Sequence, residues 1–447
     1  MQSPRFEAGD APERSVLALR HERSSMTVAV VGGGVIGVAS AYYLARAGAR
    51  VTLLERAHVA AAASYGNSGL IVPSHSVPLA RPGALAQGLR WMLDAESPFY
   101  VRPRADPALA RWLWRFRVAC TEAHVRRAIP VLRALSEASL GLFRELAGEI
   151  DFGFRTDGVL MVYRTPRGLD EGRHEAAVLE GAGIAAKIMD AAGARTIEPT
   201  LRSDIAGAVL FPADAHVTPD RFVRGLAARA ASLGAEIREG TEVLDVLTAG
   251  DRITGLDTTR GEVPCEQLVL AAGPWSPAIA RKLDLDLPIQ AAKGYSVTYV
   301  QPPAGPRVPM LLGEARVAVT PMRGERGEML RLGGTLELAG LDLSIDRRRV
   351  EAIKRGARAF LDLPTDMALL EVWRGLRPCT PDGLPALGRP RRWRNVVVAA
   401  GHAMLGLSLG PITGHLVAQL VAGQTPPVDV TALDPDRFRG RWSAGRP

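Results

Sequence analysis

A glycine-rich turn between two apolar segments constrains the fold of this chain more than any other feature. Residues 27–56 read TVAVVGGGVIGVASAYYLARAGARVTLLER, in which Gly32, Gly34 and Gly37 form a G-x-G-x-x-G pattern. The apolar runs on either side predict two parallel strands, with a helix directly after the glycines. In such a unit the glycines allow a tight turn, close approach of backbone to a pyrophosphate, and close packing of helix on strand. The sequence therefore predicts a dinucleotide-binding unit.

The acid at the end of the second apolar run strengthens this prediction. Glu55 stands where a carboxylate can accept hydrogen bonds from an adenosine ribose. The start of the helix supplies unpaired N–H groups and partial positive charge for phosphates. We expect Val35, Ile36 and Arg56 to contact the cofactor beside these groups. A glycine turn without a ligand is the alternative, and the order strand, turn, helix, strand, acid argues against it.

Length and charge restrict the class of protein. With 447 residues, 47% of them hydrophobic, the chain can bury a large core, which we expect to be divided between two domains. The net charge of +8 suggests an anionic cofactor, acidic substrates or an anionic surface. No nucleic-acid-binding motif accompanies the charge, so we expect no nucleic acid partner. No apolar run is long and clean enough to span a bilayer.

The cysteines and the first 25 residues indicate the compartment. Cys120, Cys265 and Cys379 form no C-x-x-C pair, so we expect no disulfide framework, no metal site and a reducing, cytoplasmic location. Residues 1–25 hold four arginines against four acids and lack the apolar core of a signal peptide. We expect this segment to be a disordered extension, with Met26 as an alternative start.

Residues 81–117 combine basic and aromatic side chains. Such a mixture can seat a protein on a membrane surface, and an ordinary pair of amphipathic helices is the alternative. A peripheral contact with the inner face of the membrane is therefore one hypothesis for this region. The arginines are Arg90, Arg102, Arg104, Arg111 and Arg115, and the aromatic residues are Trp91, Tyr100, Trp112, Trp114 and Phe116.

The order of predicted elements implies an α/β protein with a discontinuous nucleotide-binding domain. We assign residues 26–80, 206–285 and 370–447 to that domain, and residues 81–205 and 286–369 to a substrate-binding domain. Helices are predicted at 107–120, 125–147, 219–233, 347–361 and 410–422, and strands at 158–163, 236–246, 253–258, 267–273, 294–300, 317–321, 328–336 and 395–401.

Several sequence motifs, spread over nearly the whole chain from Met26 onward, give further information on the class of protein. The most specific is WRGLRPCTPDGLPALG at 373–388, and others are 27–56, 64–69, 97–116, 270–276, 293–298, 331–337 and 399–411. Together they resemble FAD-dependent amine oxidoreductases of the D-amino acid oxidase superfamily, above all the bacterial D-amino acid dehydrogenases. The resemblance implies a Rossmann-type FAD-binding domain beside an antiparallel-sheet substrate domain. It also implies that FAD is bound non-covalently, because Cys379 does not align with the cysteine that links flavin in sarcosine oxidase.

The resemblance assigns further residues to the cofactor. Val243 would contact the adenine through its backbone, and Gly273 would pass close to the pyrophosphate. Backbone N–H groups of residues 401–406, before the last helix, would face the flavin edge where negative charge develops on reduction. The residues expected along the isoalloxazine and around it are Ser64, Asn67, Ser68, Gly69, Leu70, Ala272, Trp275, Gly401, Met404, Leu405 and Gly406.

By the same resemblance, Arg377 of the G-L-R-P motif would hold the substrate carboxylate. A planar guanidinium fork matches two carboxylate oxygens, while a structural ion pair with Asp382 is the alternative. The strand at 317–321 lacks the tyrosine that serves as a second carboxylate ligand in oxidases of the superfamily. We therefore expect help from Tyr295 or His75, although Tyr295 could equally be a core aromatic residue.

Two more residues are candidates near the flavin. Arg331 stands where sarcosine oxidases carry a lysine beneath the flavin, and D-amino acid dehydrogenases have arginine there. A solvated strand arginine is the alternative reading of Arg331. His402 could contact flavin or substrate, or be structural. Because no nucleophile and base pair stands out, we expect a positioning mechanism in which a neutral amine delivers its α-hydrogen as hydride to flavin N5.

Two loops bear on the substrate. NSGLIVPSHS at 67–76 and GHAMLGLSLGP at 401–411 resemble the branch that acts on D-hydroxyproline. The leading substrates are therefore cis-4-hydroxy-D-proline and D-proline, with His75 meeting the ring hydroxyl and a quinone or electron-transfer protein accepting electrons. The alternatives are a glycine- or sarcosine-type oxidase, a flavin electron-transfer subunit without a substrate of its own, and an NAD-binding dehydrogenase.

Overall fold

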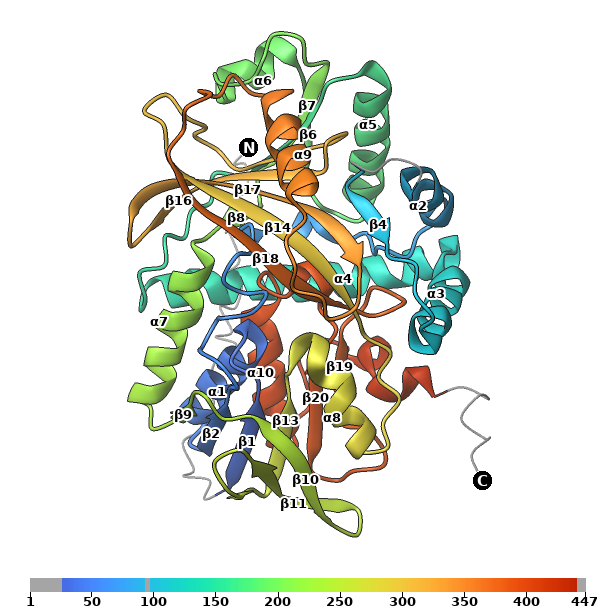
Figure 1. Ribbon diagram of the computed structural model, residues 1–447, viewed down its shortest axis with the longest axis vertical. Coiled ribbons are helices and arrows are strands. Elements are labelled where there is room, and N and C mark those ends of the chain that lie inside the picture. The colour runs from blue at the N-terminus through green and yellow to red at the C-terminus, as the bar shows by residue number, and fades with distance from the viewer. Residues whose placement is uncertain (1–25, 93–96, 440–447) are drawn as a thin grey trace, which may run out of the picture.

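Two sheets organise the chain in the computed structural model, which describes residues 26–92 and 97–439 (Figure 1). The lower sheet in this view has six strands in the order β19-β20-β13-β1-β2-β9. Its centre is β1 (Thr27–Val31), parallel to both β2 (Arg50–Leu54) and β13 (Gln267–Leu270). The outer strands are β9 (Glu236–Arg238), β20 (Val396–Ala400) and β19 (Ala386–Gly388).

The glycine fingerprint folds as the sequence predicts. Strand β1 is buried on both faces, so it forms a continuous apolar run, and α1 (Val35–Arg46) begins directly after the turn. A Cβ on Gly37 would lie 1.8 Å from the Gly32 carbonyl oxygen, so only glycine lets helix and strand approach this closely. Helix α1 packs against α7 (Pro219–Ser232) and α10 (Gly410–Val421).

The upper sheet is largely antiparallel and has nine strands, in which β14 (Gln290–Val300) lies between β18 (Leu369–Cys379) and β17 (Gly327–Leu338). Helix α9 (Arg347–Arg358) packs on this sheet. The other strands are β16 (Val317–Gly324), β15 (Met310–Leu312), β5 (Val159–Tyr163), β7 (Gly207–Phe211), β6 (Lys187–Asp190) and β4 (Phe99–Val101), which pairs with β17.

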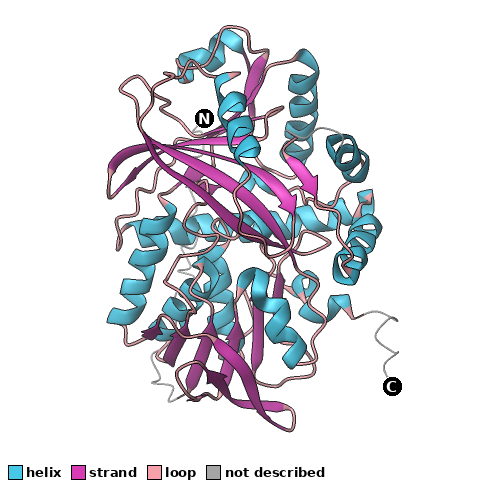
Figure 2. Cartoon of the chain, viewed as in Figure 1, coloured by secondary structure: helices cyan, strands magenta, loops and turns pink. Residues whose placement is uncertain are grey.

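The remaining helices and small strands surround these sheets (Figure 2). The helices are α2 (Ala84–Met92), α3 (Pro107–Ala119), α4 (Glu122–Ala147), α5 (Pro166–Gly181), α6 (Ala191–Ile197) and α8 (Ser276–Lys282). The small strands are β3 (Leu70–Ile71), β8 (Ala215–His216), β10 (Val243–Ala249), β11 (Arg252–Thr258) and β12 (Val263–Pro264). None of the helices in the described ranges combines the length and the apolar character needed to cross a bilayer.

Three of the differences between the structure and the sequence prediction concern how strands are arranged in the sheets. The sequence predicts no strand at β18, because Gly375 and Pro378 interrupt its apolar alternation. Both β18 and β7 pair within the upper sheet, although their residues fall in ranges that we assigned to the nucleotide-binding domain. The strand predicted at 236–246 is two strands in different sheets, β9 and β10. The expected extension at residues 1–25 lies outside the described residues.

Candidate functional site

A cavity of about 1310 Å³ lies where the two sheets meet. This volume exceeds the roughly 300–1,000 Å³ of most small-molecule sites, so it has room for a dinucleotide and a small substrate together. The β1–α1 turn, the loop after β2, the end of β13 and the segment after β20 line one part of the cavity. Strands β14, β17 and β18 line the other part.

The glycine turn forms one wall of this cavity. Gly32 has a φ of +113°, and a Cβ there would lie 2.5 Å from the Ala271 carbonyl oxygen. Gly34, Val35 and Ile36 line the cavity with Gly32, whereas Gly37 lies behind the turn. The hydroxyl of Ser64 accepts from the Val35 N–H at 2.9 Å. The turn therefore presents backbone close to the cavity, as pyrophosphate binding requires.

Glu55 lines the cavity at the end of β2, where the sequence predicts a ribose ligand. Its two carboxylate oxygens accept from the Gly33 N–H at 2.7 Å and the Ala57 N–H at 2.8 Å, which fixes the carboxylate against the glycine turn. Next to it, the Arg56 guanidinium lies 3.8 Å from the centre of the Trp275 ring. The other predicted contacts here, Val243, Ala272 and Gly273, also line the cavity.

The loop after β2 contributes Ser64, Asn67, Ser68 and Leu70 to the cavity wall. The side chain of Asn67 accepts from the Gly69 N–H at 2.8 Å, and this turn gives Gly69 a φ of +78°. Gly69 itself packs against the Val217 carbonyl rather than lining the cavity.

Arg331 holds this loop from behind. Its Nη1 donates to the carbonyl oxygens of Tyr65 and Asn67, both at 3.0 Å, and its Nε donates to the Thr298 hydroxyl at 3.1 Å. The side chain is buried, and this burial lowers the pKa of Arg331. The reading of Arg331 as a solvated strand arginine is therefore wrong. Arg331 does not line the cavity, and it acts on the cofactor loop through hydrogen bonds.

The segment after β20 forms a 3-10 turn, η3 (Ala403–Leu405), over the cavity. Met404, Leu405 and Gly406 line the cavity, and Gly401, with a φ of +80°, turns the chain behind them. Helix α10 begins only at Gly410. The start of α10 agrees with the helix predicted at 410–422, and the segment before it, which was expected to face the flavin, is a 3-10 turn that lines the cavity.

His402 also lines the cavity, but one of its ring nitrogens already has a hydrogen-bond partner inside the protein. Its Nε2 lies 3.0 Å from the Thr413 hydroxyl. Burial lowers the pKa of His402 to about 3, so the ring is neutral at neutral pH. This packing is compatible with a structural role, which the sequence left open.

Arg377 projects from β18 into the cavity without a carboxylate partner among the described residues. Its Nη1 donates to the Thr335 carbonyl at 2.8 Å. Gly294 on the neighbouring strand makes room for it, since a Cβ there would lie 2.1 Å from Arg377 Nη1. Burial lowers the pKa of Arg377, which reflects the cost of an isolated cation. The alternative ion pair with Asp382 is contradicted, because Asp382 pairs with Arg437 at 2.8 Å.

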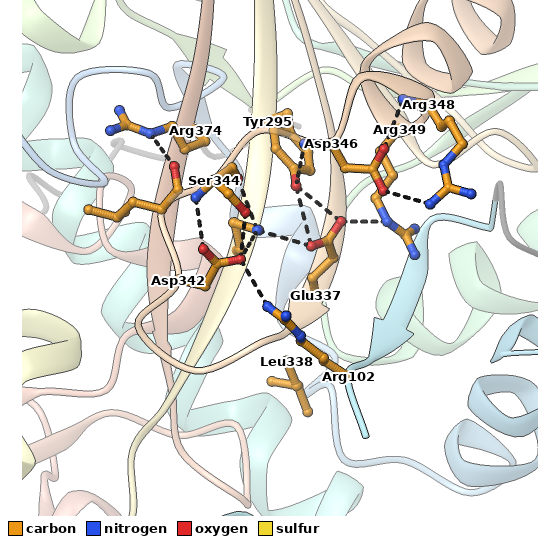
Figure 3. A network of polar contacts seen from close by, with 12 residues as sticks. Arg102, Tyr295, Glu337, Leu338, Asp342, Ser344, Asp346, Arg348, Arg349 and Arg374 are labelled. Atoms are coloured by element: carbon orange, nitrogen blue, oxygen red, sulfur yellow. Dashed lines mark hydrogen bonds and ion pairs between the residues drawn. The ribbon is translucent and has the colours of Figure 1, made fainter. Parts of the chain in front are cut away.

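Tyr295 belongs to a network of polar contacts next to the cavity (Figure 3). Its hydroxyl lies 3.2 and 3.3 Å from the two oxygens of Glu337, which also pairs with Arg349 at 2.5 Å and with Lys293 at 3.4 Å. Asp342 contacts Lys293 at 3.0 Å. The Tyr295 hydroxyl is therefore occupied by a carboxylate of the protein.

Three residues that the sequence did not single out adjoin the site. Thr335, beside Arg377, has a φ of +67°, and its buried hydroxyl lacks a hydrogen-bond partner in the described chain. Such backbone strain in a non-glycine residue is often found at functional sites. Ser74 and Asp214 form hydrogen bonds behind His75, which lines the cavity. Only the tertiary fold brings these groups together.

Comparisons with known proteins agree with this geometry. Residues 27–420 match the family model for FAD dependent oxidoreductases of the DAO type. The chain belongs to the DAO family of FAD-dependent oxidoreductases. It is similar to a D-amino acid dehydrogenase of Methylobacterium radiotolerans, at 36% identity over 94% of this chain and 100% of the relative. A D-amino acid dehydrogenase of Xanthobacter autotrophicus is 34% identical over 92% of this chain and 99% of its own length.

Solved structures of other proteins support the fold. Glycine oxidase from Geobacillus kaustophilus superposes with a TM-score of 0.76 at 26% identity, covering 93% of this chain and all of that one. L-proline dehydrogenase from P. horikoshii gives a TM-score of 0.72 at 21% identity, over 93% of this chain and 98% of that one. The predicted two-part α/β fold of this family is confirmed.

The described residues fit FAD. The glycine turn has no room for a Cβ at Gly32 or Gly37, which gives the tight turn and the close helix–strand packing of a dinucleotide-binding unit, and Gly34 lines the cavity without a side chain. Predicted cofactor residues from six separate chain segments line one cavity. The predicted FAD cofactor is thus confirmed, and the protein is an oxidoreductase that depends on it. Within the described ranges, no group of three or more His, Cys, Asp or Glu side chains could hold a metal ion.

Proposed function

We propose that the protein is an FAD-dependent dehydrogenase of D-amino or D-imino acids that holds the substrate carboxylate on Arg377. The observation that carries this proposal is a partly buried guanidinium that lines the cavity without a counter-charge in the described chain. A desolvated cation of this kind is costly unless an anion pairs with it. A carboxylate ligand offers two oxygens in the plane of the guanidinium fork.

The protein side of the reaction is positioning. Thr335 fixes the guanidinium through its carbonyl, and Gly294 leaves the space that the guanidinium occupies. Trp373 packs into gaps left by Gly66 and Gly375, where a Cβ would lie 2.1 Å and 1.9 Å from the indole, and it closes the wall between loop and sheet. Bound FAD would supply the hydride acceptor for the substrate α-carbon. Holding the carboxylate and excluding water are therefore the tasks of this chain's residues.

We propose cis-4-hydroxy-D-proline or D-proline as the substrate. The support is the resemblance of the loops at 67–76 and 401–411 to the D-hydroxyproline branch, together with a mostly apolar cavity wall of Trp112, Phe116 and Leu336 near Arg377. A pyrrolidine ring presents apolar methylene groups to such a wall.

We also propose that the electrons leave to a quinone or an electron-transfer protein at a membrane surface. Helices α2 and α3 lie on the same side of the molecule (Figure 1). Their most exposed large apolar residues are Leu89, Trp114 and Val118, at 65%, 60% and 62% exposure, among several arginines. Such a surface suits anionic lipid headgroups. Sedimentation with anionic vesicles tests this contact, and recovery of all protein in the supernatant at low salt would contradict it.

Anaerobic titration of the FAD-loaded protein tests the substrate proposal. The ligands are both enantiomers of proline, 4-hydroxyproline and alanine, together with glycine and sarcosine, and the readout is visible flavin absorbance. Rapid bleaching by D-imino acids is the expected result. Bleaching by glycine or sarcosine with stoichiometric peroxide in air would instead support an oxidase. Absence of bleaching by every compound would support an electron-transfer subunit.

A further inference from the structure

A chain of three polar side chains leads from the cavity into the protein interior. His75 lines the cavity on η1 (Pro73–His75), and its Nδ1 lies 3.1 Å from the Ser74 hydroxyl. The Ser74 hydroxyl lies 2.5 Å from Asp214 Oδ2, and the Ser74 N–H donates to Asp214 Oδ1 at 3.1 Å. Asp214 is fully buried. In the described chain, the hydrogen bonds to its carboxyl group come only from Ser74.

We propose that His75, Ser74 and Asp214 form a proton relay that removes the proton from the substrate ammonium group. This inference rests on the proposed function. A free amino or imino acid is an ammonium ion at neutral pH, and its nitrogen lone pair must be free before the α-hydrogen can leave as hydride. A base that reaches the cavity from a fixed position meets this need.

The hydrogen-bond pattern gives the relay two states. When Asp214 is ionised, the Ser74 hydroxyl donates to Asp214 and the Nδ1–H of His75 donates to Ser74. The Nε2 atom of His75 then carries a lone pair. When Asp214 is protonated, every donor in the chain reverses, and Nε2 carries the hydrogen. The protonation of Asp214 therefore sets which tautomer His75 adopts.

Transfer through the relay balances in atoms and charge. The N–H bond of the substrate ammonium breaks as a bond to His75 Nε2 forms. The Nδ1 hydrogen of His75 moves to the Ser74 oxygen, and the former Ser74 hydroxyl hydrogen moves to Asp214 Oδ2. The substrate becomes a neutral amine, Asp214 becomes a neutral acid, and His75 ends neutral in its other tautomer.

The surroundings of the three groups suit this direction of transfer. Burial raises the pKa of Asp214 to about 7, close to the pH at which a proton acceptor is most effective. Burial lowers the pKa of His75, so the ring passes a proton on rather than retaining it. The charged groups that face His75 are Glu175, which raises its pKa, and Arg316, which lowers it. Glu175 is 3.7 Å from Arg81, so its influence is partly compensated.

This role replaces the ring-hydroxyl contact that the sequence suggested for His75, because both roles need the same Nε2 atom. The two roles predict different substrate dependence. A relay acts on D-proline and on hydroxy-D-proline alike, since both carry the ammonium group. A hydroxyl contact would affect only the hydroxylated compound.

The test measures the rate of flavin bleaching against pH in the FAD-loaded protein and in two variants, Asp214→Asn and Ser74→Ala. At pH 8, where Asp214 is mostly ionised and the substrate is still an ammonium ion, we expect each variant to be slower by about 10²-fold, a typical contribution of a general base. The deficit should shrink as the pH approaches the pKa of the substrate ammonium, because the amine then arrives neutral. Ser74→Thr, which keeps a hydroxyl, should restore most of the rate.

A matched control comes from the same turn. The Ser76 hydroxyl is also buried and donates to the Pro73 carbonyl at 2.7 Å, outside the relay and the cavity. Ser76→Ala should therefore leave the pH profile unchanged. A deficit of the Asp214 variant that is equal at every pH, or that is confined to hydroxy-D-proline, would overturn the relay.

A second measurement keeps the relay separate from the proposed function. Infrared spectroscopy of the protein without substrate should show a buried carboxylic acid band that titrates near neutral pH and disappears in Asp214→Asn. Absence of that band in the wild type would overturn the relay. If the band is present but no D-amino or D-imino acid bleaches the flavin, the proposed function is wrong, while the assignment of Asp214 as a proton acceptor is retained.

Discussion

Buried cations occur at two neighbouring places on the upper sheet, and the protein treats them in opposite ways. Arg349 on α9 pairs with the carboxylate of Glu337 (Figure 3). Lys293 on β14 shares this carboxylate and also contacts Asp342. One residue away in the strand pairing, Arg377 lies opposite Ala292 and has a carbonyl as its partner. The first group is complete within the chain, whereas the second lacks an anion.

This difference distinguishes charged side chains that have a structural role from those that can bind a ligand. A buried ion pair whose members satisfy each other fixes the shape of the sheet and has no capacity for a ligand. A buried guanidinium held in place by a carbonyl keeps its positive charge available. The network around Glu337 therefore has a structural role, whereas Arg377 is the group that we propose to bind a substrate carboxylate.

The largest expected effect is on activity. Arg377→Met should lower kcat/KM for a D-imino acid by about 10³-fold, because truncation of one partner in a buried charge pair costs about 2–5 kcal/mol or more. Its thermal stability should stay near that of the wild type, since the substitution removes an uncompensated charge. Steady-state kinetics and thermal unfolding measure the two effects.

A matched control for this variant is Arg389→Met. The Arg389 guanidinium is also held by carbonyl groups, those of Leu420 and Val421, but it lies outside the cavity. Its loss should reduce stability and leave kcat/KM unchanged. An equal loss of activity in both variants would contradict the assignment of Arg377 as a ligand.

The second effect is on stability and tests the complete network. Glu337→Gln leaves Lys293 and Arg349 without their shared anion, and we expect a loss of about 3–5 kcal/mol in the free energy of unfolding. Glu328→Gln, on the same strand with a side chain 63% exposed, should cost no more than about 1 kcal/mol. Denaturant unfolding measures both. A Glu337 variant as stable as the Glu328 variant would show that the network is not structural.

The third prediction concerns the pH dependence of stability and His402, a buried side chain that is neutral at neutral pH. The pKa of His402 is about 3 in the folded protein and about 6.5 in an unfolded chain. Above pH 6.5 both states are neutral, so the contribution to stability is full. As the pH falls below 6.5, only the unfolded chain gains a proton, and stability falls by about 1.4 kcal/mol per pH unit. Unfolding at several pH values should show a weaker acid dependence in His402→Gln, and equal slopes would contradict this account.

The smallest effect is expected at Thr335. Its φ of +67° favours glycine, so Thr335→Gly should change the free energy of unfolding by about +1 kcal/mol or less. Because the carbonyl that holds Arg377 is retained, kcat/KM should fall less than tenfold. Thr335→Ser, which keeps both the hydroxyl and the strain, should match the wild type in both measurements. A gain in stability from Thr335→Ser would contradict the strain argument.

The sequence predicted the parts of the molecule whose signals are local. The glycine turn and Glu55 lie within one βαβ unit, so their spacing alone was informative. The resemblance to DAO-family enzymes added cofactor residues that line the cavity. The burial of Arg331 was not predictable from its strand pattern, because both faces of β17 are covered near it.

Features that depend on contacts across the fold could not be predicted. Gly294 makes room for Arg377 only because β14 and β18 pair in one particular register. Asp214 meets Ser74 because β8 pairs with β3, which places two distant loops together. The positive φ of Thr335 likewise coincides with a register shift between β14 and β17, from Lys293↔Glu337 to Tyr295↔Gly334.

The most direct test of the central claim compares D-proline with pyrrolidine, which lacks the carboxylate, in the wild type and in Arg377→Met. Anaerobic flavin bleaching gives the rate for each pair. We predict that the wild type prefers D-proline by about 10³-fold, which corresponds to the free energy lost when one partner of a buried charge pair is removed. The variant should lose most of this preference. A variant that still prefers D-proline as strongly as the wild type would contradict the assignment of Arg377 as the carboxylate ligand.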